Sequence, residues 1–560
     1  MLGLSIPLII IGATIALSWP LGRYMRWAMD ARSSSSPTDN STGRFDSVAV
    51  AVLGKAASKG QTWKEYCVSM LVFNVLMFVV VFTILTTQQW LPLNPDGKEN
   101  LEASLAFNTA ASFTSNTNLQ HYSGEVSMSY LSQLGALMWL QFVSAATGLA
   151  AVTALCRGLS GRTDMGNFYR DVWRATGLVL LPLAFVLASL LVLLGTPMTL
   201  DGAAVATTLE GATQTIARGP VAAFVTIKQL GTNGGGFFGP NSTHPLENPN
   251  FYTNVLTNMA IILIPMATVW MFGWITNRIK HAAVVFGVML LLYAVFVGSA
   301  ATLESQPTHA FAQLPVEADM NLEGKELRFG TTAGALWAVS TTSTSNGSVN
   351  AMHDSLNPLT GLFPMAGMWL NVIFGGVGVG LINMFLFVIT AVFLAGMMVG
   401  RTPEYLGRKV EAREMKLAIL ALLSHPLFIL GGTAIFASSS WGLDALNNPG
   451  SHGLSEIIYE FSSAAANNGS GFEGLGDNTV PWNIATGVVM LLGRFIPIIA
   501  PLAIVGSMAA KRTTPESAGT FRVDTPTFGV VLLGTVLIVG ALLFLPIAVL
   551  GPIAEFLTVS

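Results

Sequence analysis

The sequence predicts an all-α polytopic membrane protein with about ten transmembrane helices. Four helix–pore loop–helix repeats are expected around a pseudo-fourfold pore, with one extra helix at each end. Three observations predict this fold class. Only 10% of the 560 residues are charged, 52% are hydrophobic and the mean hydropathy is +0.59, whereas a soluble domain carries about 25% charged residues. Ten apolar runs are long enough to cross a bilayer. Four polar loops recur between these runs at nearly constant spacing.

The apolar runs define the expected spans in chain order. They lie at 3–22, 66–88, 133–154, 176–196, 254–274, 282–301, 364–398, 415–437, 484–507 and 527–548. No small-residue cleavage site precedes the basic flank of the first run, so we expect a retained helix rather than a signal peptide. The expected domains are a first helix with a cytoplasmic loop (1–65), four pore repeats (66–154, 176–274, 282–398 and 415–507) and a last helix (527–548).

The distribution of charge tests this map independently. With the N-terminus outside, 21 of the 27 Lys and Arg residues fall in cytoplasmic segments, as the positive-inside rule requires. The external segment 438–483 carries five acidic residues and no Lys or Arg, and an acidic outer mouth concentrates cations. The net charge of −3 implies no nucleic-acid partner, and the two cysteines exclude a disulfide scaffold or a multi-thiolate metal site.

Each of the four long external segments contains a short apolar stretch followed by Ser, Thr, Asn and Gly. When Asn118, Gly234, Gly347 and Gly469 are aligned, the spacings are 116, 113 and 122 residues. A single such loop is equally typical of an external turn. Four in register, each preceded by an apolar half-helix, favour re-entrant pore loops in one orientation. Because the first repeat has Asn118 where the others have Gly, we expect the fourfold symmetry to be broken there.

The residue types in these loops indicate which ion they suit. A re-entrant helix directs its partially negative C-terminal end at the pore centre, and the following loop replaces the hydration shell of an ion with backbone carbonyl oxygens. Glycine permits the backbone angles that turn successive carbonyls one way. None of the four loops has a carboxylate at its centre. The pattern therefore predicts a monovalent cation held by dipoles.

Two features are expected below the loops. The long seventh run contains Phe374-Gly-Gly-Val-Gly-Val-Gly380, whose glycines (Gly375, Gly376, Gly378 and Gly380) should break the helix. The break is interpreted either as an unwound gate that diverts the ion sideways or as close helix packing through small residues. Arg494 is the only Lys or Arg in the interior of an expected span, since Lys416 lies at the very start of 415–437. It either repels cations from a straight exit or hydrogen-bonds loop carbonyls, and both roles can hold together.

Three segments carry a resemblance that covers essentially the whole chain. Residues 231–249 (GTNGGGFFGPNSTHPLENP), 114–120 (TSNTNLQ) and 464–473 (AAANNGSGFE) resemble the KdpA family, the potassium-binding subunits of potassium-transporting ATPases within the superfamily of potassium transporters. The resemblance implies a potassium filter at Asn118, Gly234, Gly347 and Gly469. Its neighbouring residues would be Thr114, Asn116, Asn233, Asn346 and Asn468, with Gln120 at the outer mouth.

The same resemblance implies a place in a larger machine. The chain would select external potassium and pass it through an intramembrane tunnel to the P-type ATPase subunit of a Kdp complex. Two single-span subunits would complete that complex in the bacterial inner membrane. Neither a GxxxxGK[ST] phosphate loop nor a DKTG phosphorylation motif occurs in the sequence. We therefore expect a non-catalytic subunit without a cofactor, with potassium as its substrate.

Two other functions fit part of the pattern. A stand-alone potassium or sodium transporter of the Trk, Ktr or HKT kind shares the four-repeat design but normally has eight spans, lacking the first and last seen here. A proton- or sodium-coupled secondary transporter needs titratable carboxylates at mid-membrane. Every Asp and Glu lies outside the expected spans, which disfavours the second alternative.

Overall fold

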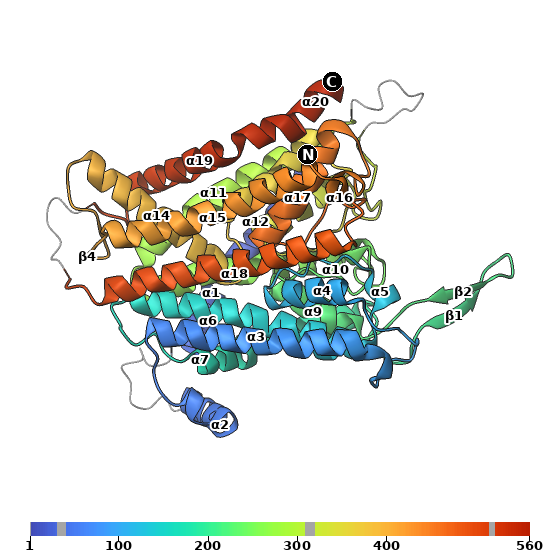
Figure 1. Cartoon of the computed structure of the whole chain (residues 1–560), viewed down its shortest axis with the longest axis horizontal. Coiled ribbons are helices and arrows are strands. Elements are labelled where there is room, and N and C mark those ends of the chain that lie inside the picture. Colours follow the sequence, from blue (N-terminus) through green and yellow to red (C-terminus); the bar gives the residue numbers. More distant parts are fainter. Residues whose placement is uncertain (1, 31–40, 309–319, 514–520, 560) are drawn as a thin grey trace.

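The computed structural model describes residues 2–30, 41–308, 320–513 and 521–559. Its long helices run side by side along the longest axis of the molecule (Figure 1). Ten of the described helical segments are long and apolar enough to cross a membrane, which confirms the all-helical class and the ten expected spans. In chain order the helices and strands are α1 (Leu2–Met29), α2 (Ser41–Leu53), α3 (Trp63–Thr87), α4 (Ala103–Thr114), α5 (Gly124–Ser127), α6 (Trp139–Leu159), α7 (Phe168–Arg174), α8 (Leu181–Leu193), β1 (Ala204–Thr207), β2 (Thr213–Ile216), α9 (Val221–Leu230), α10 (Phe251–Ile275), α11 (Ile279–Glu304), α12 (Thr331–Ser343), α13 (Pro358–Leu370), α14 (Val379–Met398), β3 (Glu404–Tyr405), β4 (Arg408–Lys409), α15 (Ala412–Ala437), α16 (Ser440–Leu443), α17 (Gly450–Ala466), α18 (Val480–Ala509), α19 (Pro526–Ala548) and α20 (Ala554–Val559).

The eight central spans form four units of one plan, each with a half-helix between two long helices. Unit 1 contains α3, α4 and α6; unit 2 contains α8, α9 and α10; unit 3 contains α11, α12 and a second long helix that is broken into α13 and α14; unit 4 contains α15, α17 and α18. The second long helices have 61–89% of their most apolar stretch buried, against 22–50% for the first long helices. The second helices therefore form an inner ring around the half-helices, and the first helices form an outer ring.

The two extra helices pack on the outside of this arrangement. Helix α1 lies along α10, where the Trp270 indole packs edge-on against Trp19 at 4.8 Å and donates a 3.1 Å hydrogen bond to Ser18 Oγ. On α1, Gly22 faces the Trp270 Cβ so closely that a side chain there would collide with α10. Helix α19 packs on unit 3, where Phe544 stacks on Trp369 at 5.2 Å.

The seventh expected span, 364–398, is broken as its glycines predict. Helix α13 ends at Leu370, residues 371–378 are not helical, and α14 begins at Val379. The break starts at Asn371, which adopts the left-handed conformation (φ 48°), and continues through left-handed Phe374, Gly375 and Gly378. Gly380 lies in the first turn of α14 rather than in the break. The expected single long span is therefore a half-length helix, a loop and a second helix.

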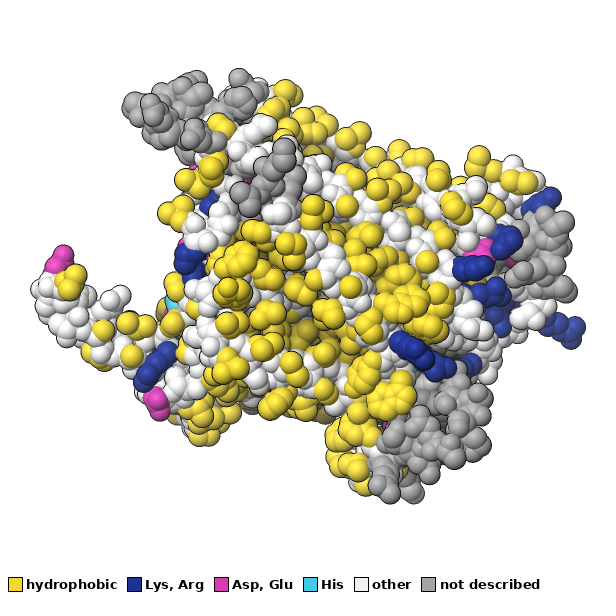
Figure 2. Space-filling model, turned by 180° about the vertical axis from the view of Figure 1, so that it is seen from behind, with side chains coloured by type: hydrophobic (Ala, Val, Ile, Leu, Met, Phe, Trp, Pro, Cys, Tyr) yellow, Lys and Arg dark blue, Asp and Glu magenta, His cyan; other side chains and the backbone are white. Residues whose placement is uncertain are grey.

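Some elements outside the bundle were not anticipated from the sequence. The antiparallel hairpin β1–β2 projects from one end of the molecule, and the short helix α2 lies beside the bundle toward the opposite end (Figure 1). Residues 31–40 of the expected cytoplasmic loop lie outside the described residues. Figure 2 shows apolar side chains covering the middle of one face, with Lys and Arg gathered toward the end that carries α2. An apolar surface of this extent suits contact with lipid.

Candidate functional site

The loops that follow the four half-helices share one backbone conformation. Each has two left-handed residues separated by one residue of negative φ. In a chain of L-amino acids this alternation turns successive carbonyl oxygens toward the same side, and left-handed φ favours Gly and Asn. The left-handed pairs are Asn116 and Asn118 (φ 64° and 56°), Thr232 and Gly234 (48° and 83°), Ser345 and Gly347 (48° and 98°), and Asn467 and Gly469 (54° and 103°).

One backbone hydrogen bond recurs in all four loops. The residue between each left-handed pair donates its N–H to the carbonyl five residues earlier, near the end of the half-helix. This is the bond that closes a helix in the Schellman motif. The four bonds are Thr117 N–H to Ser112 O (2.9 Å), Asn233 to Lys228 (2.9 Å), Asn346 to Thr341 (2.8 Å) and Asn468 to Ser463 (2.9 Å).

The glycines also let neighbouring loops lie edge to edge. A Cβ on Gly234 would collide with the carbonyl oxygen of Asn346 in unit 3. A Cβ on Gly347 would collide with Asn468 O in unit 4, and one on Gly469 with Thr117 O in unit 1. The loops therefore follow one another around a ring in the order of the chain. Glycine is needed at these three positions because it adopts a positive φ readily and because it has no side chain.

Unit 1 reaches the same conformation with Asn118. Its left-handed backbone matches that of the three glycines, so the expected break in symmetry concerns the side chain rather than the backbone. Asn118 Oδ1 accepts a 3.1 Å hydrogen bond from Gln141 Nε2. A Cβ added to Gly235 in unit 2 would lie only 2.9 Å from the Asn118 Cβ. The additional glycine of unit 2 thus leaves room for the asparagine of unit 1.

The middle residue of each loop presents a buried carbonyl oxygen without a donor. Thr117, Asn233, Asn346 and Asn468 are each 0% exposed. Within the described part of the chain, no group donates a hydrogen bond to their four carbonyl oxygens, which we call the carbonyl ring. Buried carbonyls normally have a partner. A ring of neutral oxygens at the negative ends of four half-helices is suited to a desolvated monovalent cation.

The asparagine side chains near the ring mostly cross-link the units. Asn116 Nδ2 donates to the carbonyls of Gly231 and Thr232 at 3.2 and 2.8 Å. Asn346 Nδ2 donates to Lys228 O, and Asn468 Nδ2 donates to Thr341 O. Asn233 Nδ2 reaches back to Asn116 Oδ1 at 2.7 Å. These asparagines, which we expected to offer neutral ligand oxygens, therefore chiefly hold neighbouring units together. The buried Asn233 Oδ1 and Thr114 Oγ1 atoms have no hydrogen-bond partner among the described residues.

The broken segment 371–378 lies directly against the inner side of these loops. Gly375 N–H donates to Ser343 O at 2.8 Å, and Val377 N–H donates to Thr232 Oγ1 at 2.9 Å. Ser345 Oγ contacts Asn371 Oδ1 at 2.8 Å. The segment also packs closely on α6, because a Cβ on Gly378 would collide with the carbonyl of Gly148. The geometry contains features of both interpretations, an unwound loop below the ring and close packing through glycine.

Arg494 lies beside the same segment. It is 3% exposed, and its guanidinium donates a 3.1 Å hydrogen bond to Ser144 O on α6. The space next to Gly148 that a Cβ would fill is 3.3 Å from Arg494 Nη2 and also adjoins Val377 O. A buried positive charge therefore lies next to the break. The hydrogen bond of Arg494 goes to a carbonyl of helix α6 rather than to the loop carbonyls that the sequence suggested.

Gln120 braces the outer side of the ring. Its side-chain oxygen accepts from Gly236 N–H at 2.7 Å, and its side-chain nitrogen donates to Gly236 O at 3.0 Å. The same nitrogen is 3.0 Å from Tyr122 Oη. Gln120 thus joins the outer segments of units 1 and 2 through a paired hydrogen bond that resembles one step of a β-ladder.

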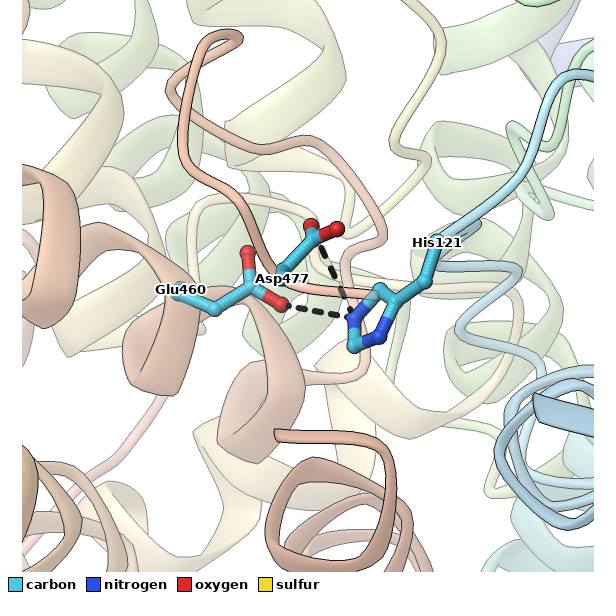
Figure 3. Close-up of side chains that lie close together, drawn as sticks. All are labelled: His121, Glu460 and Asp477. Carbon is cyan, nitrogen blue, oxygen red and sulfur yellow. Dashed lines mark hydrogen bonds and ion pairs between the residues drawn. The ribbon is translucent and has the colours of Figure 1, made fainter. Parts of the chain in front are cut away.

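His121, the next residue, joins unit 1 to unit 4. Its Nε2 lies 3.2 Å from Glu460 Oε1 on α17 and 3.8 Å from Asp477 Oδ2, and both contacts meet at this one ring nitrogen (Figure 3). Its Nδ1 is 2.7 Å from Asn483 Oδ1. Burial alone would lower the pKa of His121, but the Asp477 and Glu460 carboxylates raise it to about 9. A protonated histidine of unit 1 therefore holds two acidic groups of unit 4 together.

Lys228 lies outside the expected spans, between 176–196 and 254–274, but its side chain is completely buried. Lys228 lies on α9 and forms a buried ion pair with Glu247. The Glu247 Oε1 atom also accepts from Phe237 N–H and Phe238 N–H. A lysine inside a short apolar half-helix is the sequence signal that could have revealed this pair, because a buried lysine needs a partner.

Comparison with known proteins gives three findings. A family model described as KdpA, potassium-transporting ATPase A subunit, matches residues 8–557. The potassium-transporting ATPase potassium-binding subunit of Geobacillus kaustophilus (strain HTA426) is 48% identical over 548 residues, 97% of each chain. The crystal structure of the potassium transporter TrkH from Vibrio parahaemolyticus matches with a TM-score of 0.50 and 13% identity, over 76% of this chain and 84% of that chain. At this identity the last likeness concerns the fold alone.

The ion pair of His121 predicts a pH-dependent stability. Because the folded pKa of about 9 lies above the ordinary value of 6.5, the stabilisation is complete below pH about 6.5 and is lost as the pH rises through about 9. We expect the apparent melting temperature of the detergent-solubilised protein to fall over this interval. His121→Gln should melt lower at pH 6 and show a flatter profile. His244→Gln, at a histidine that stacks on Phe238, should keep the wild-type decline. Parallel profiles for wild type and His121→Gln would contradict the assignment.

Proposed function

The chain belongs to the family of potassium-transporting ATPase A subunits, and on that premise we propose that it binds and translocates potassium as the potassium-binding subunit of an ATP-driven uptake pump. The observation that carries the proposal is the carbonyl ring. Four buried backbone carbonyls, to which no described residue donates a hydrogen bond, lie in neighbouring loops at the ends of four half-helices. Such a ring compensates a potassium ion for its lost hydration shell.

In the proposed filter, each of four pore repeats contributes one loop. The repeats are 66–154, 176–274, 282–398 and 415–507. Asn118, Gly234, Gly347 and Gly469 set the direction of the carbonyls through their left-handed backbone. Asn116, Asn233, Asn346 and Asn468 hold neighbouring loops in register. Thr114 supplies a hydroxyl at the inner end of α4. Because all the oxygens are neutral, a divalent ion is not stabilised.

Below the filter, the segment 371–378 closes the straight path and Arg494 repels a cation that would continue along it. The hydrogen bonds of Gly375 and Val377 to the loops above support a closed position. A cavity of about 40 Å³ beside this segment is lined by Asn371, Asn383 and His425 among apolar side chains. Because polar side chains line this cavity, we place a sideways exit for the ion here, between unit 3, unit 4 and α19. The exit would lead toward the subunit that hydrolyses ATP.

The proposed setting is the inner membrane of a bacterium with the N-terminus outside. The concentration of Lys and Arg in the segments assigned to the cytoplasm supports this orientation. The partners are a P-type ATPase subunit and two small single-span subunits, as the family resemblance implies. The alternative of a stand-alone Trk-like transporter is disfavoured because the family match extends over 8–557 and so includes most of α1 and all of α19.

The first test separates ion binding from ATP hydrolysis. We expect the purified chain to bind rubidium or potassium without hydrolysing ATP, because potassium binding and ATP hydrolysis belong to different subunits. Ion-stimulated ATP hydrolysis should appear only after reconstitution with the P-type subunit. Equilibrium binding of radioactive rubidium and a phosphate-release assay measure the two properties. Hydrolysis by the chain alone, or a failure of the complete complex to bind potassium, would contradict the proposed function.

Substitution of the filter glycines should weaken ion discrimination. In Gly347→Ser the new Cβ would collide with Asn468 O and would also strain a left-handed residue (φ 98°). We expect rubidium and caesium to compete with potassium more effectively in this variant and in Gly234→Ser. Gly330→Ser is a matched control, because Gly330 is left-handed (φ 80°) but a Cβ there meets nothing within 4 Å. Wild-type competition in both filter variants would exclude this filter.

Substitution of Gln120 should separate bracing from charge. Gln120→Ala removes the paired hydrogen bonds to Gly236 and should lower the apparent potassium affinity modestly. Gln120→Arg also adds a charge at roughly 10 Å from the ion, which at an effective dielectric near 20 opposes binding by about 1–2 kcal/mol, or about tenfold. The additional loss should shrink at high salt. If transport titrations give equal potassium affinities for the two variants, the added charge has no effect and Gln120 acts only through its hydrogen bonds to Gly236.

A further inference from the structure

The outer carbonyls of the four loops are not equivalent. They belong to Asn118, Gly234, Gly347 and Gly469, one residue beyond the carbonyl ring. Asn241 Nδ2 donates a 2.8 Å hydrogen bond to Gly234 O. Within the described residues, no group donates to the corresponding oxygens of Asn118, Gly347 and Gly469. The outer level therefore has three free carbonyls and one that is already engaged.

The orientation of the Asn241 amide is fixed by a buried charge. Its Oδ1 accepts from Lys228 Nζ at 2.5 Å and from Ser242 N–H at 2.8 Å. An ammonium group can only donate, so the amide oxygen must face Lys228 and the amide N–H must face Gly234. The contact with the cation also polarises the amide and strengthens its donor end.

Lys228 is itself held in place by Glu247. Both side chains are 0% exposed and form an ion pair. The other carboxylate oxygen of Glu247 accepts from Phe237 N–H at 2.6 Å and from Phe238 N–H at 3.0 Å. The three side chains of Lys228, Asn241 and Glu247, which we call the clamp, therefore connect the half-helix α9 to the segment after its loop and end on a loop carbonyl.

The position of Lys228 differs in kind from its equivalents in the other units. The aligned residues are Ser112, Thr341 and Ser463, which carry short hydroxyls. Thr341 Oγ1 accepts from Gly347 N–H, and Ser463 Oγ accepts from Gly469 N–H, both at 2.9 Å. These hydroxyls brace the backbone nitrogen and leave the glycine carbonyl free. Only unit 2 uses a long cationic side chain that recruits Asn241 to the carbonyl.

We propose that Asn241, oriented by the Lys228–Glu247 pair, is a specificity-determining residue of the outer ion position. The inference deepens the proposed function and rests on it, because it assumes that a potassium ion passes these carbonyls. A carbonyl engaged by a polarised amide attracts a cation less and rotates less freely. The ion at this level is therefore coordinated off centre by the three free carbonyls, and the held carbonyl limits how far the position widens for a larger ion.

The test compares two variants of Asn241 with a matched control in the complete complex. Asn241→Ala removes the donor. Asn241→Asp keeps the shape and the contact with Lys228 but replaces the N–H donor with an oxygen. We expect both to lower the preference for potassium over rubidium and caesium by about three- to tenfold. Asn248→Ala is the control, because Asn248 is also buried in the same segment and donates to Ser242 O and Asn254 Oδ1, outside the loops.

Three measurements on each variant decide the outcome. The melting temperature reports folding, the potassium affinity reports ion binding, and the ratio of the potassium to rubidium and caesium affinities reports specificity. A structural role alone would lower the melting temperature in the Asn241 and Asn248 variants alike without changing the ratio. The inference would be overturned if the Asn241 variants that fold show the wild-type ratio of potassium to rubidium and caesium affinities. Asn241→Asp has nearly the same shape as asparagine and serves as the test if Asn241→Ala does not fold. An absence of monovalent-cation binding in the wild-type complex would instead contradict the proposed function.

Discussion

The carbonyl oxygens of Thr117, Asn233, Asn346 and Asn468 are buried, and no described residue donates a hydrogen bond to them. Leaving such a carbonyl oxygen unpaired costs about 1–3 kcal/mol. The surrounding structure must therefore prevent the loops from rearranging to bring hydrogen-bond donors to these oxygens. The closing hydrogen bonds of the half-helices, the edge-to-edge glycines and the cross-linking asparagines all serve this end. A cation bound at the proposed filter would offset this penalty.

The four units reach one backbone conformation by different means. Unit 1 uses Asn118, and Gly235 of unit 2 leaves the space for its side chain. Unit 2 replaces a bracing hydroxyl with Lys228 and adds Glu247 and Asn241. Unit 3 breaks its second helix at 371–378 and places the break under the loops. The four loops therefore share one backbone conformation, whereas the side chains and helices around them differ from unit to unit.

The carbonyl ring is built from uncharged residues, whereas two buried ion pairs lie elsewhere in the described part of the chain. Lys228 pairs with Glu247 and Lys325 pairs with Glu304, and all four side chains are fully buried. Breaking such a pair by removing one partner costs about 3–5 kcal/mol, because the remaining charge is left uncompensated. Arg494 lies on the inner side, next to Ser144 and Gly148. The Lys228–Glu247 pair therefore supports the loop of unit 2 through Asn241 without adding a net charge beside the carbonyl ring.

The sequence by itself determined the ten spans, the positions of the four loops, the break in the seventh span and the family, because apolar runs, glycine clusters and extended motifs are local properties of the chain. It did not reveal the hairpin β1–β2, the burial of Lys228 or which carbonyls lack donors. Those features depend on contacts between distant residues, such as Gln120 with Gly236 and Asn233 with Asn116. It also left the conformation of Asn118 open, because the space that admits its side chain is provided by Gly235 in another unit. Only the tertiary structure decided these points, since a hydrogen-bond donor is present or absent at a carbonyl only when neighbouring units have packed.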